Sequence, residues 1–203
     1  MPTNYREALG EIDIYLFDQI LKGRFDHYQT ILDAGCGNGR NLVYFLQNNY
    51  DVYGIDADPT AISEVKYLAA KLSPGTPQEN FKVAKLEHMP FKNEMFDVII
   101  CSAVLHFATD PTHFEKMLFA CWNTLKPNGI FFARLASNIG IEKLVTHLGD
   151  GRYLLPDGSE RYLIDLEKIL HYTRLLNGQL TDPIKTTNVQ NLRCMTTWCM
   201  IKL

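Results

Sequence analysis

The chain has 203 residues, 46% of them hydrophobic, which is enough to bury a full core in one domain. Its formal net charge of −3 does not provide the clustered basic surface that phosphate-backbone binding needs, so a nucleic-acid substrate is not expected. No apolar run approaches the roughly 18 residues of a membrane span, and no basic and apolar leader opens the chain. We therefore expect a soluble, unprocessed cytoplasmic protein without a membrane partner.

Cysteine and histidine give no sign of a disulfide framework or a metal site. The five cysteines form no Cys-x-x-Cys pair, and their odd number fits reduced, mostly buried thiols in a reducing compartment. The histidines other than His106 show no close pair at metal-binding spacing, so we expect no metal ion.

Strands and helices alternate over the first two thirds of the chain. Apolar residues recur at helical spacing from Glu7 to about Lys22, which predicts a leading amphipathic helix within an N-terminal helical segment, residues 1–29. Asp58-Pro59 and Asp110-Pro111 each place an N-cap carboxylate before a proline at the first helical position. The alternation predicts an α/β domain in which helices cover both faces of a parallel sheet. Strand-like runs occupy residues 30–34, 51–55, 80–84, 96–102 and 130–135.

The pattern changes after residue 137. Residues 140–148 predict a short helix, and Pro156-Asp157-Gly158-Ser159 predicts a hairpin. Residues 138–165 are therefore an insertion at a place where a lid could form. We expect all 203 residues to form one domain. The remaining predicted elements are a helix over 166–176 and two strands, over 179–189 and 192–201, joined closely enough to pair antiparallel.

A glycine-rich loop follows the first predicted strand, in the run Asp33-Ala34-Gly35-Cys36-Gly37-Asn38-Gly39. Glycine at alternate positions lets a strand end press its backbone against a ligand, which indicates a nucleoside cofactor. A dinucleotide fingerprint counted from Gly35 would place its third glycine at Arg40 rather than at Gly39, so the spacing favours a cofactor other than NAD.

Asp56 closes the second predicted strand, 21 residues after Gly35. A carboxylate at this strand end can accept hydrogen bonds from both hydroxyls of a ribose. Asp58, two residues later, is better explained as the N-cap of the following helix.

These motifs, with later landmarks in the same order, resemble the class I S-adenosylmethionine-dependent methyltransferases through about residue 137. The resemblance implies a doubly wound, seven-stranded, mostly parallel Rossmann-like sheet with an antiparallel last strand. It also implies methyl transfer from S-adenosylmethionine to a small-molecule acceptor by in-line displacement, mainly through positioning, with S-adenosylhomocysteine as the product. Within the family, the run Gly37-Asn38-Gly39-Arg40-Asn41 is similar to the small enzymes grouped with tellurite-resistance and thiopurine methyltransferases. The later landmarks are Met89-Pro90-Phe91, Phe96-Asp97-Val98-Ile99-Ile100 and Leu125-Lys126-Pro127-Asn128-Gly129.

The resemblance also implies a role for each residue of the cofactor site. Asp33 and Gly35 would face the amino-acid end of the cofactor, Gly37 and Gly39 would permit close backbone approach, Asp56 with the adjacent Ala57 would hold the ribose, and Leu86 would offer its backbone N–H to the adenine.

Lys85 departs from the family pattern. Its position often carries an aspartate that accepts a hydrogen bond from the adenine amino group, and lysine cannot accept. Glu87 or a backbone carbonyl is expected to replace that contact.

Two residues near strand ends are candidates for the acceptor site. His106, shortly after the fourth strand, has an intrinsic pKa suited to proton removal near neutrality, so it is a candidate catalytic base as well as a pocket-lining residue or a packed wall residue. Arg134 lies in an apolar strand, where a substrate carboxylate or a salt bridge to a nearby acid would be its partner. In the insertion, Arg152, Tyr153 and Arg161 could touch substrate, although solvated roles are more common for such residues.

Two other functions fit parts of the sequence. An NAD(P)-dependent oxidoreductase would also use a strand, a glycine loop and Asp56, and a non-catalytic protein could bind S-adenosylmethionine alone. The motif Asn-Pro-Pro-aromatic, which binds planar amino groups in related enzymes, is replaced by Ser102-Ala103-Val104-Leu105. Adenine or glutamine acceptors are therefore not expected, and no feature of the sequence indicates an oligomeric state.

Overall fold

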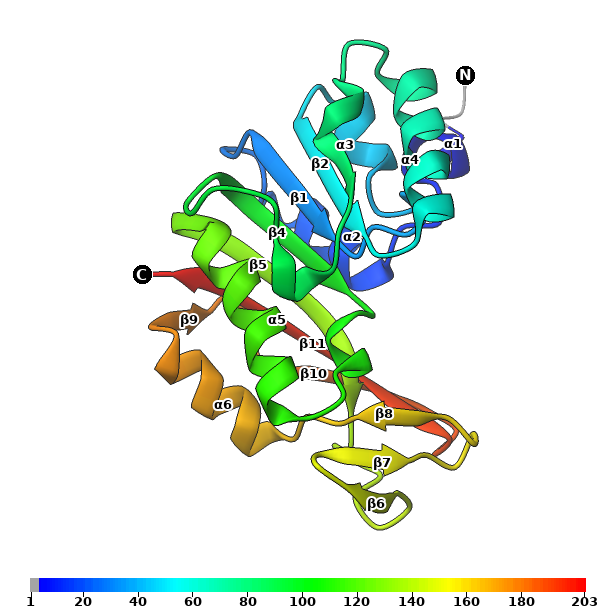
Figure 1. The fold of residues 1–203 in the computed structure, drawn as a ribbon, viewed down its shortest axis with the longest axis vertical. Helices are drawn as coiled ribbons and strands as arrows, with labels where there is room; N and C mark the ends of the chain where they lie inside the picture. Colours follow the sequence, from blue (N-terminus) through cyan, green and yellow to red (C-terminus); the bar gives the residue numbers. More distant parts are fainter. Residues whose placement is uncertain (1–3) are drawn as a thin grey trace.

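A mixed sheet forms the centre of the molecule (Figure 1). The computed structural model describes residues 4–203; in it seven strands follow the order β10-β11-β5-β4-β1-β2-β3, and a short eighth, β9, also pairs with β11. Strands β1 to β5 are parallel, whereas β11 runs antiparallel to β5, β9 and β10. The predicted seven-stranded, mostly parallel sheet is confirmed. The strands are β1 (Thr30–Ala34), β2 (Asp51–Asp56), β3 (Phe81–Val83), β4 (Phe96–Ser102), β5 (Leu125–Ser137), β9 (Gly178–Leu180), β10 (Lys185–Val189) and β11 (Arg193–Lys202).

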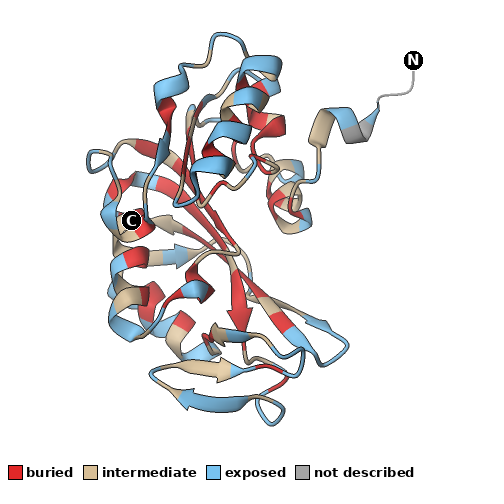
Figure 2. Cartoon of the chain, turned by 45° about the vertical axis from the view of Figure 1, so that its right-hand side comes forward, coloured by how far each residue is buried: buried red, intermediate tan, exposed pale blue. Residues whose placement is uncertain are grey.

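Helices cover both faces of this sheet, as the alternation predicts. Along β4, Ile99 and Cys101 pack with α5 and α6, whereas Val98 and Ile100 pack with α2, α3 and α4. Successive side chains of a strand point to opposite faces, so each strand contributes to two cores, which appear as the buried centre of Figure 2. The helices are α1 (Tyr5–Leu9), α2 (Ile14–Leu21), α3 (Val43–Gln47), α4 (Pro59–Leu72), α5 (Pro111–Thr124) and α6 (Leu166–Leu175).

The predicted leading helix is two helices, which corrects the continuous helix expected from Glu7 to Lys22. Gly10 has φ of +62°, a left-handed conformation that ends α1. Asp13 then caps α2, its carboxylate accepting a hydrogen bond from Tyr15 N at 2.9 Å. Leu16 of α2 is buried in the core, so this second helix does cover one face of the sheet.

The insertion forms a second, three-stranded sheet from β6 (Thr146–Gly149), β7 (Arg152–Leu154) and β8 (Glu160–Tyr162), at the lower end of Figure 1. The hairpin predicted at residues 156–159 is confirmed, because it joins β7 to β8. The helix predicted over 140–148 is wrong. Its apolar spacing also suits a strand, and residues from Thr146 onward form β6 because they pair with β7.

The strand predicted over 179–189 is divided into β9 and β10. Pro183 lies in the interval and has no N–H for a ladder hydrogen bond. Both pieces still pair antiparallel with β11, so the predicted pairing of the last strands holds.

Local chemistry fixes other elements as the sequence predicts. The carboxylates of Asp58 and Asp110 cap α4 and α5, accepting hydrogen bonds from Thr60 N and His113 N, each at 2.8 Å. All five cysteines are buried and free. Among residues 4–203, no helix is long and apolar enough to cross a bilayer.

Candidate active site

Two cavities lie where the parallel strands β1, β2, β4 and β5 end. The first, of about 350 Å³, is named here the loop cavity because the glycine loop forms one wall. The second, of about 370 Å³, is named the arginine cavity. Ala103, directly after β4, lines both, so the two cavities border one residue. The loop cavity is lined by Gly35, Gly37, Asp56, Ala57, Ala84, Lys85, Leu86, Glu87, Ala103, Val104, Phe107, His113 and Met117.

The glycine loop turns tightly over the end of β2. The backbone N–H groups of Gly35 and Cys36 both donate to Ile55 O, at 2.8 and 2.9 Å. Gly35 has φ of +86°, and a Cβ there would lie 2.3 Å from Val104 Cγ2. Only glycine fits this turn, which brings bare backbone to the cavity.

The other two glycines of the loop have different surroundings. A Cβ at Gly37 would meet nothing within 4 Å, so this residue faces open space and lines the loop cavity. A Cβ at Gly39 would lie 2.7 Å from Val65 Cγ2 of α4. The structure therefore places Gly39 outside the cavity lining, where it permits close packing of the loop against a helix.

Asp56 is oriented by two backbone groups. Its Oδ2 accepts a hydrogen bond from Gly37 N and its Oδ1 accepts one from Asp58 N, both at 2.9 Å. A carboxylate has about four acceptor sites, so two remain for a ligand in the loop cavity. Asp58, in contrast, caps α4 and does not line the cavity.

Asp33 lies behind the loop and is fully buried. Neither carboxyl oxygen has a hydrogen-bond partner among the described residues. Burial raises the pKa of Asp33 to about 8; the charge of Arg40 opposes this rise, and that of Asp56 adds to it. The protein therefore leaves the hydrogen-bonding capacity of this buried carboxyl unused.

The opposite wall of the loop cavity comes from a 3₁₀ turn, Leu86–His88, and from α5. Glu87 Oε1 lies 3.5 Å from His113 Nε2. Burial raises the pKa of Glu87, but hydrogen bonds from its own backbone N–H and from His113 outweigh burial and lower it. An acceptor carboxylate is therefore present beside Lys85, as the sequence analysis allows.

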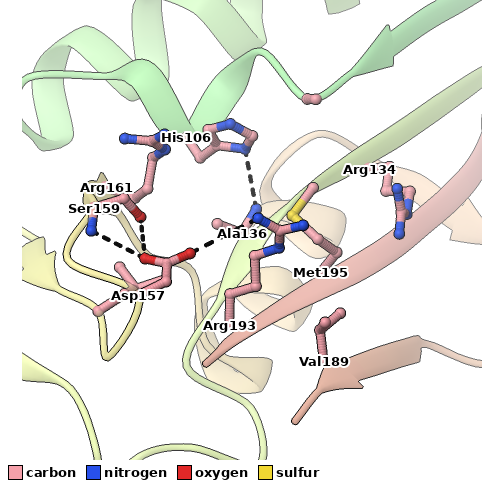
Figure 3. Close-up of a pocket in the computed structure, with 11 residues that line it drawn as sticks. His106, Arg134, Ala136, Asp157, Ser159, Arg161, Val189, Arg193 and Met195 are labelled. Carbon is pink, nitrogen blue, oxygen red and sulfur yellow. Dashed lines mark hydrogen bonds and ion pairs between the residues drawn. The ribbon is translucent and has the colours of Figure 1, made fainter. Parts of the chain in front are cut away.

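The arginine cavity is enclosed by β5, the small sheet and β11 (Figure 3). Ala103 has φ of +64°, an uncommon conformation for a residue with a Cβ, and its N–H donates to Arg134 O at 2.7 Å. The cavity is lined by Ala103, His106, Arg134, Ala136, Leu155, Asp157, Ser159, Arg161, Val189, Arg193 and Met195.

His106 is buried beside this cavity, with 6% of its surface exposed. Its Nδ1 accepts a hydrogen bond from Ala136 N at 3.2 Å. A backbone N–H only donates, so the proton of the neutral ring is on Nε2. Burial lowers the pKa of His106 to about 4, with Arg161 and Arg134 adding to the effect. Near neutrality the ring is an uncharged donor at Nε2.

Arg134 has a buried partner that the sequence analysis missed. Its Nη1 lies 3.1 Å from Asp13 Oδ2, and Ser102 Oγ donates to the same oxygen at 3.1 Å. Asp13 N donates to Asn41 Oδ1 at 3.0 Å. Of the two partners expected for Arg134, the acid is therefore present. Asp13 could have been found in the sequence as the N-cap of α2. A single continuous helix from Glu7 to Lys22 has no internal N-cap, so that prediction concealed it.

The family of the chain follows from comparison with known proteins. Residues 32–133, half of the chain, match the family model of the methyltransferase domain. The chain belongs to this family, which lies in the class I S-adenosylmethionine-dependent superfamily. Among the described residues, no group of three His, Cys, Asp or Glu is placed to hold a metal ion.

Individual proteins resemble the chain over different lengths. An uncharacterized methyltransferase of Synechocystis is 33% identical over 103 residues, which cover 51% of this chain and 45% of that protein. The chain spans about half the length of the curated relatives it matches. The PH0226 protein of Pyrococcus horikoshii has a TM-score of 0.73 at 14% identity, covering 94% of this chain and 89% of its own.

A second similar structure contains ligands. The 1,6-didemethyltoxoflavin-N1-methyltransferase of Burkholderia thailandensis, with 1,6-didemethyltoxoflavin and S-adenosylhomocysteine bound, has a TM-score of 0.69 at 17% identity and coverages of 98% and 81%. At these identities the solved structures show the fold.

The residues present fit the cofactor of the family, S-adenosylmethionine. Asp56 keeps two acceptor sites for ribose hydroxyls, and Asp33 keeps an unused carboxyl near the loop. Leu86 and Met117 supply apolar surface for a flat base.

The substitution Asp33→Asn should reduce the dependence of stability on pH. The folded pKa of about 8 exceeds the ordinary value of 3.8, so the contribution of Asp33 to stability is most favourable below about pH 4 and declines as pH rises towards 8. Asparagine has no proton to lose. From pH 5 to pH 8 the wild type should lose on the order of 3 kcal/mol more than the variant. Urea unfolding of the cofactor-free protein at several pH values measures the free energy of unfolding of each variant. The control Asp51→Asn changes an exposed carboxylate and should keep the pH dependence of the wild type. Equal losses of stability in the wild type and Asp33→Asn would contradict the prediction.

The tautomer of His106 can be measured directly. Proton–nitrogen NMR should show Nε2–H for this ring and no protonation between pH 5.5 and 9, because its pKa is lowered to about 4. The variant His106→Gln assigns the signal by removing it. An Nδ1–H ring, or a titration centred near 6.5, would show that the ring is available as a base.

Proposed function

We propose that this chain transfers a methyl group from S-adenosylmethionine to a small-molecule acceptor. The observation that carries the proposal is that a nucleoside-sized cavity and a second cavity share Ala103 at the carboxyl end of β4. A donor in one and an acceptor in the other would meet beside this residue. Family membership favours S-adenosylmethionine over the dinucleotide of an oxidoreductase.

The loop cavity would hold the ribose and the amino-acid end of the cofactor through groups at the ends of β1 and β2. Asp56 would accept both ribose hydroxyls on the acceptor sites that Gly37 N and Asp58 N leave open. Asp33 and the backbone at Gly35 would serve the amino-acid end, where a cationic ammonium group would compensate the buried carboxyl. Ala57 would lie along the ribose as a second wall.

The adenine would lie between the 3₁₀ turn and α5. Leu86 N would donate to the ring, and the carboxylate of Glu87 would accept from the amino group in place of the usual aspartate. Lys85 lines the same cavity and can serve only as a donor. His113 holds Glu87 in position at 3.5 Å.

Catalysis would rest mainly on positioning. When bound, S-adenosylmethionine supplies a methyl group already activated by a positive sulfur. The protein therefore has to hold the acceptor in line and exclude water, which can supply most of the rate. His106 would donate from Nε2 to the acceptor rather than remove its proton, because its Nδ1 is occupied by Ala136 N. The proton lost by the acceptor would pass to solvent.

The three-stranded sheet beside the arginine cavity also has a proposed role. We propose that the three-stranded sheet of residues 138–165 is the cover of the acceptor cavity within a single domain, since Leu155, Asp157, Ser159 and Arg161 line that cavity.

The net charge of −3 favours a small acceptor over nucleic acid, and five buried free thiols favour the cytoplasm. The run Gly37-Asn38-Gly39-Arg40-Asn41 favours the tellurite-resistance and thiopurine branch.

The substitution Asp56→Asn tests the proposal. It places an amide N–H₂ where an oxygen accepts, so affinity for S-adenosylhomocysteine should fall about tenfold to a hundredfold in calorimetric titration. The matched control is Asp58→Asn, which keeps a competent N-cap outside the cavity and should leave affinity unchanged.

The same titrations separate the alternatives. Binding of NAD, with no binding of S-adenosylhomocysteine, would overturn the cofactor assignment. Tight binding of S-adenosylhomocysteine without turnover of any acceptor in a broad screen would leave a binding protein instead of an enzyme.

A further inference from the structure

We infer that the methyl acceptor is a small acid with an apolar body, and that the arginine cavity binds its carboxylate or phosphate through Arg134, Arg161 and Arg193. This inference rests on the proposed methyl transfer. It joins Arg134 and Arg161, which the sequence analysis considers separately as possible substrate contacts, with Arg193 in one anion site, and no spacing in the sequence indicates that the three converge.

The charge of the cavity is opposite to that of the chain. Three arginines line it against one lining carboxylate, Asp157, and one buried carboxylate behind Arg134, Asp13, so its balance is positive, whereas the whole chain has a net charge of −3. His106 is uncharged near neutrality and adds a donor. A concave site with clustered positive charge attracts anions. The arginines come from three separate strands, β5, β8 and β11, and Figure 3 shows them around one space.

Each guanidinium keeps hydrogen-bonding capacity. Arg134 uses Nη1 for Asp13, and its Nε is buried with no partner among the described residues. Arg161 donates from Nη1 to Glu160 O at 2.7 Å and lies over the ring of Phe107. These contacts use part of the five donors of each group.

Arg193 is the most open of the three. Its side chain is 57% exposed, and its Nη1 lies 3.8 Å from Asp157 Oδ2, beyond hydrogen-bond distance. Asp157 is instead engaged by Ser159, whose N and Oγ donate to it at 3.0 and 2.6 Å. An arriving carboxylate or phosphate can therefore pair with Arg193 without breaking a close ion pair.

The remaining lining and the size of the cavity describe the body of the acid. Ala136, Leu155, Val189 and Met195 supply apolar surface, and about 370 Å³ suits a small molecule. Since Ala103 borders the loop cavity, an acid anchored by the arginines would present its far end to the methyl donor.

Binding of probe acids to the whole chain tests the inference. Benzoate, phenyl phosphate and uncharged benzamide are titrated by NMR in the presence of saturating S-adenosylhomocysteine. At least one anion should bind about tenfold more tightly than benzamide. The variants Arg161→Gln and Arg193→Gln should each weaken that anion about tenfold. Preference for benzoate would identify a carboxylate acceptor, and preference for phenyl phosphate a phosphorylated one.

The matched control is Arg152→Gln. This arginine lies in β7 of the same small sheet and pairs with Glu160, outside the cavity lining, so anion affinity should stay within twofold. Arg134 is not substituted, because its removal would leave the buried Asp13 without its cationic partner and could unfold the protein.

The outcomes separate the two proposals. Equal binding of benzamide, or no anion binding that depends on Arg161 and Arg193, overturns the anion site even if S-adenosylhomocysteine binds. If S-adenosylhomocysteine does not bind, the proposed methyl transfer fails, and the same probes without it decide whether the arginines form an anion site.

Discussion

The ion pair between buried Asp13 and partly buried Arg134 joins the parts of the molecule that make the site. Asp13 caps α2, and its carboxylate accepts a hydrogen bond from Ser102 at the end of β4. Its backbone N–H donates to the side chain of Asn41, which follows the glycine loop. With Arg134 at 3.1 Å, one carboxylate holds the N-terminal helix against the ends of two strands. Removal of Arg134 would leave the buried charge of Asp13 uncompensated, which costs up to about 3–5 kcal/mol. The same pair fixes the guanidinium that borders the second cavity.

The two cavities use different parts of the chain. The loop cavity is shaped by backbone, since a turn at Gly35 and two N–H groups on Asp56 set its surface. The arginine cavity is shaped by long side chains from strands that are distant in sequence. Ala103 lies between them with φ of +64°, and such conformations persist where the surrounding structure enforces them, frequently at functional sites. This division suits an enzyme whose cofactor is constant and whose acceptor is specific to the protein.

The sequence predicts features that depend on neighbouring residues. The caps at Asp58 and Asp110, the strand runs and the glycine loop are local patterns, and the structure contains them. The break after Gly10 is less visible, because apolar spacing continues across it. The apolar spacing of residues 140–148 suits a helix or a strand, and pairing with β7 makes the last part of the segment a strand. The sequence suggests His106, Arg134 and Arg161 singly as substrate contacts, but neither Arg193 nor the meeting of the three arginines was predictable, because three separate strands have to be brought together first.

We propose that a cofactor in the loop cavity presents its methyl group to the arginine cavity beside Ala103. The most direct measurement is a crystal structure of the protein with S-adenosylhomocysteine bound. We expect the ribose hydroxyls within hydrogen-bond distance of Asp56 and the cofactor sulfur beside Ala103, facing His106 and Arg134. A ribose away from Asp56, or a sulfur turned from Ala103 with the second cavity closed off, would contradict it.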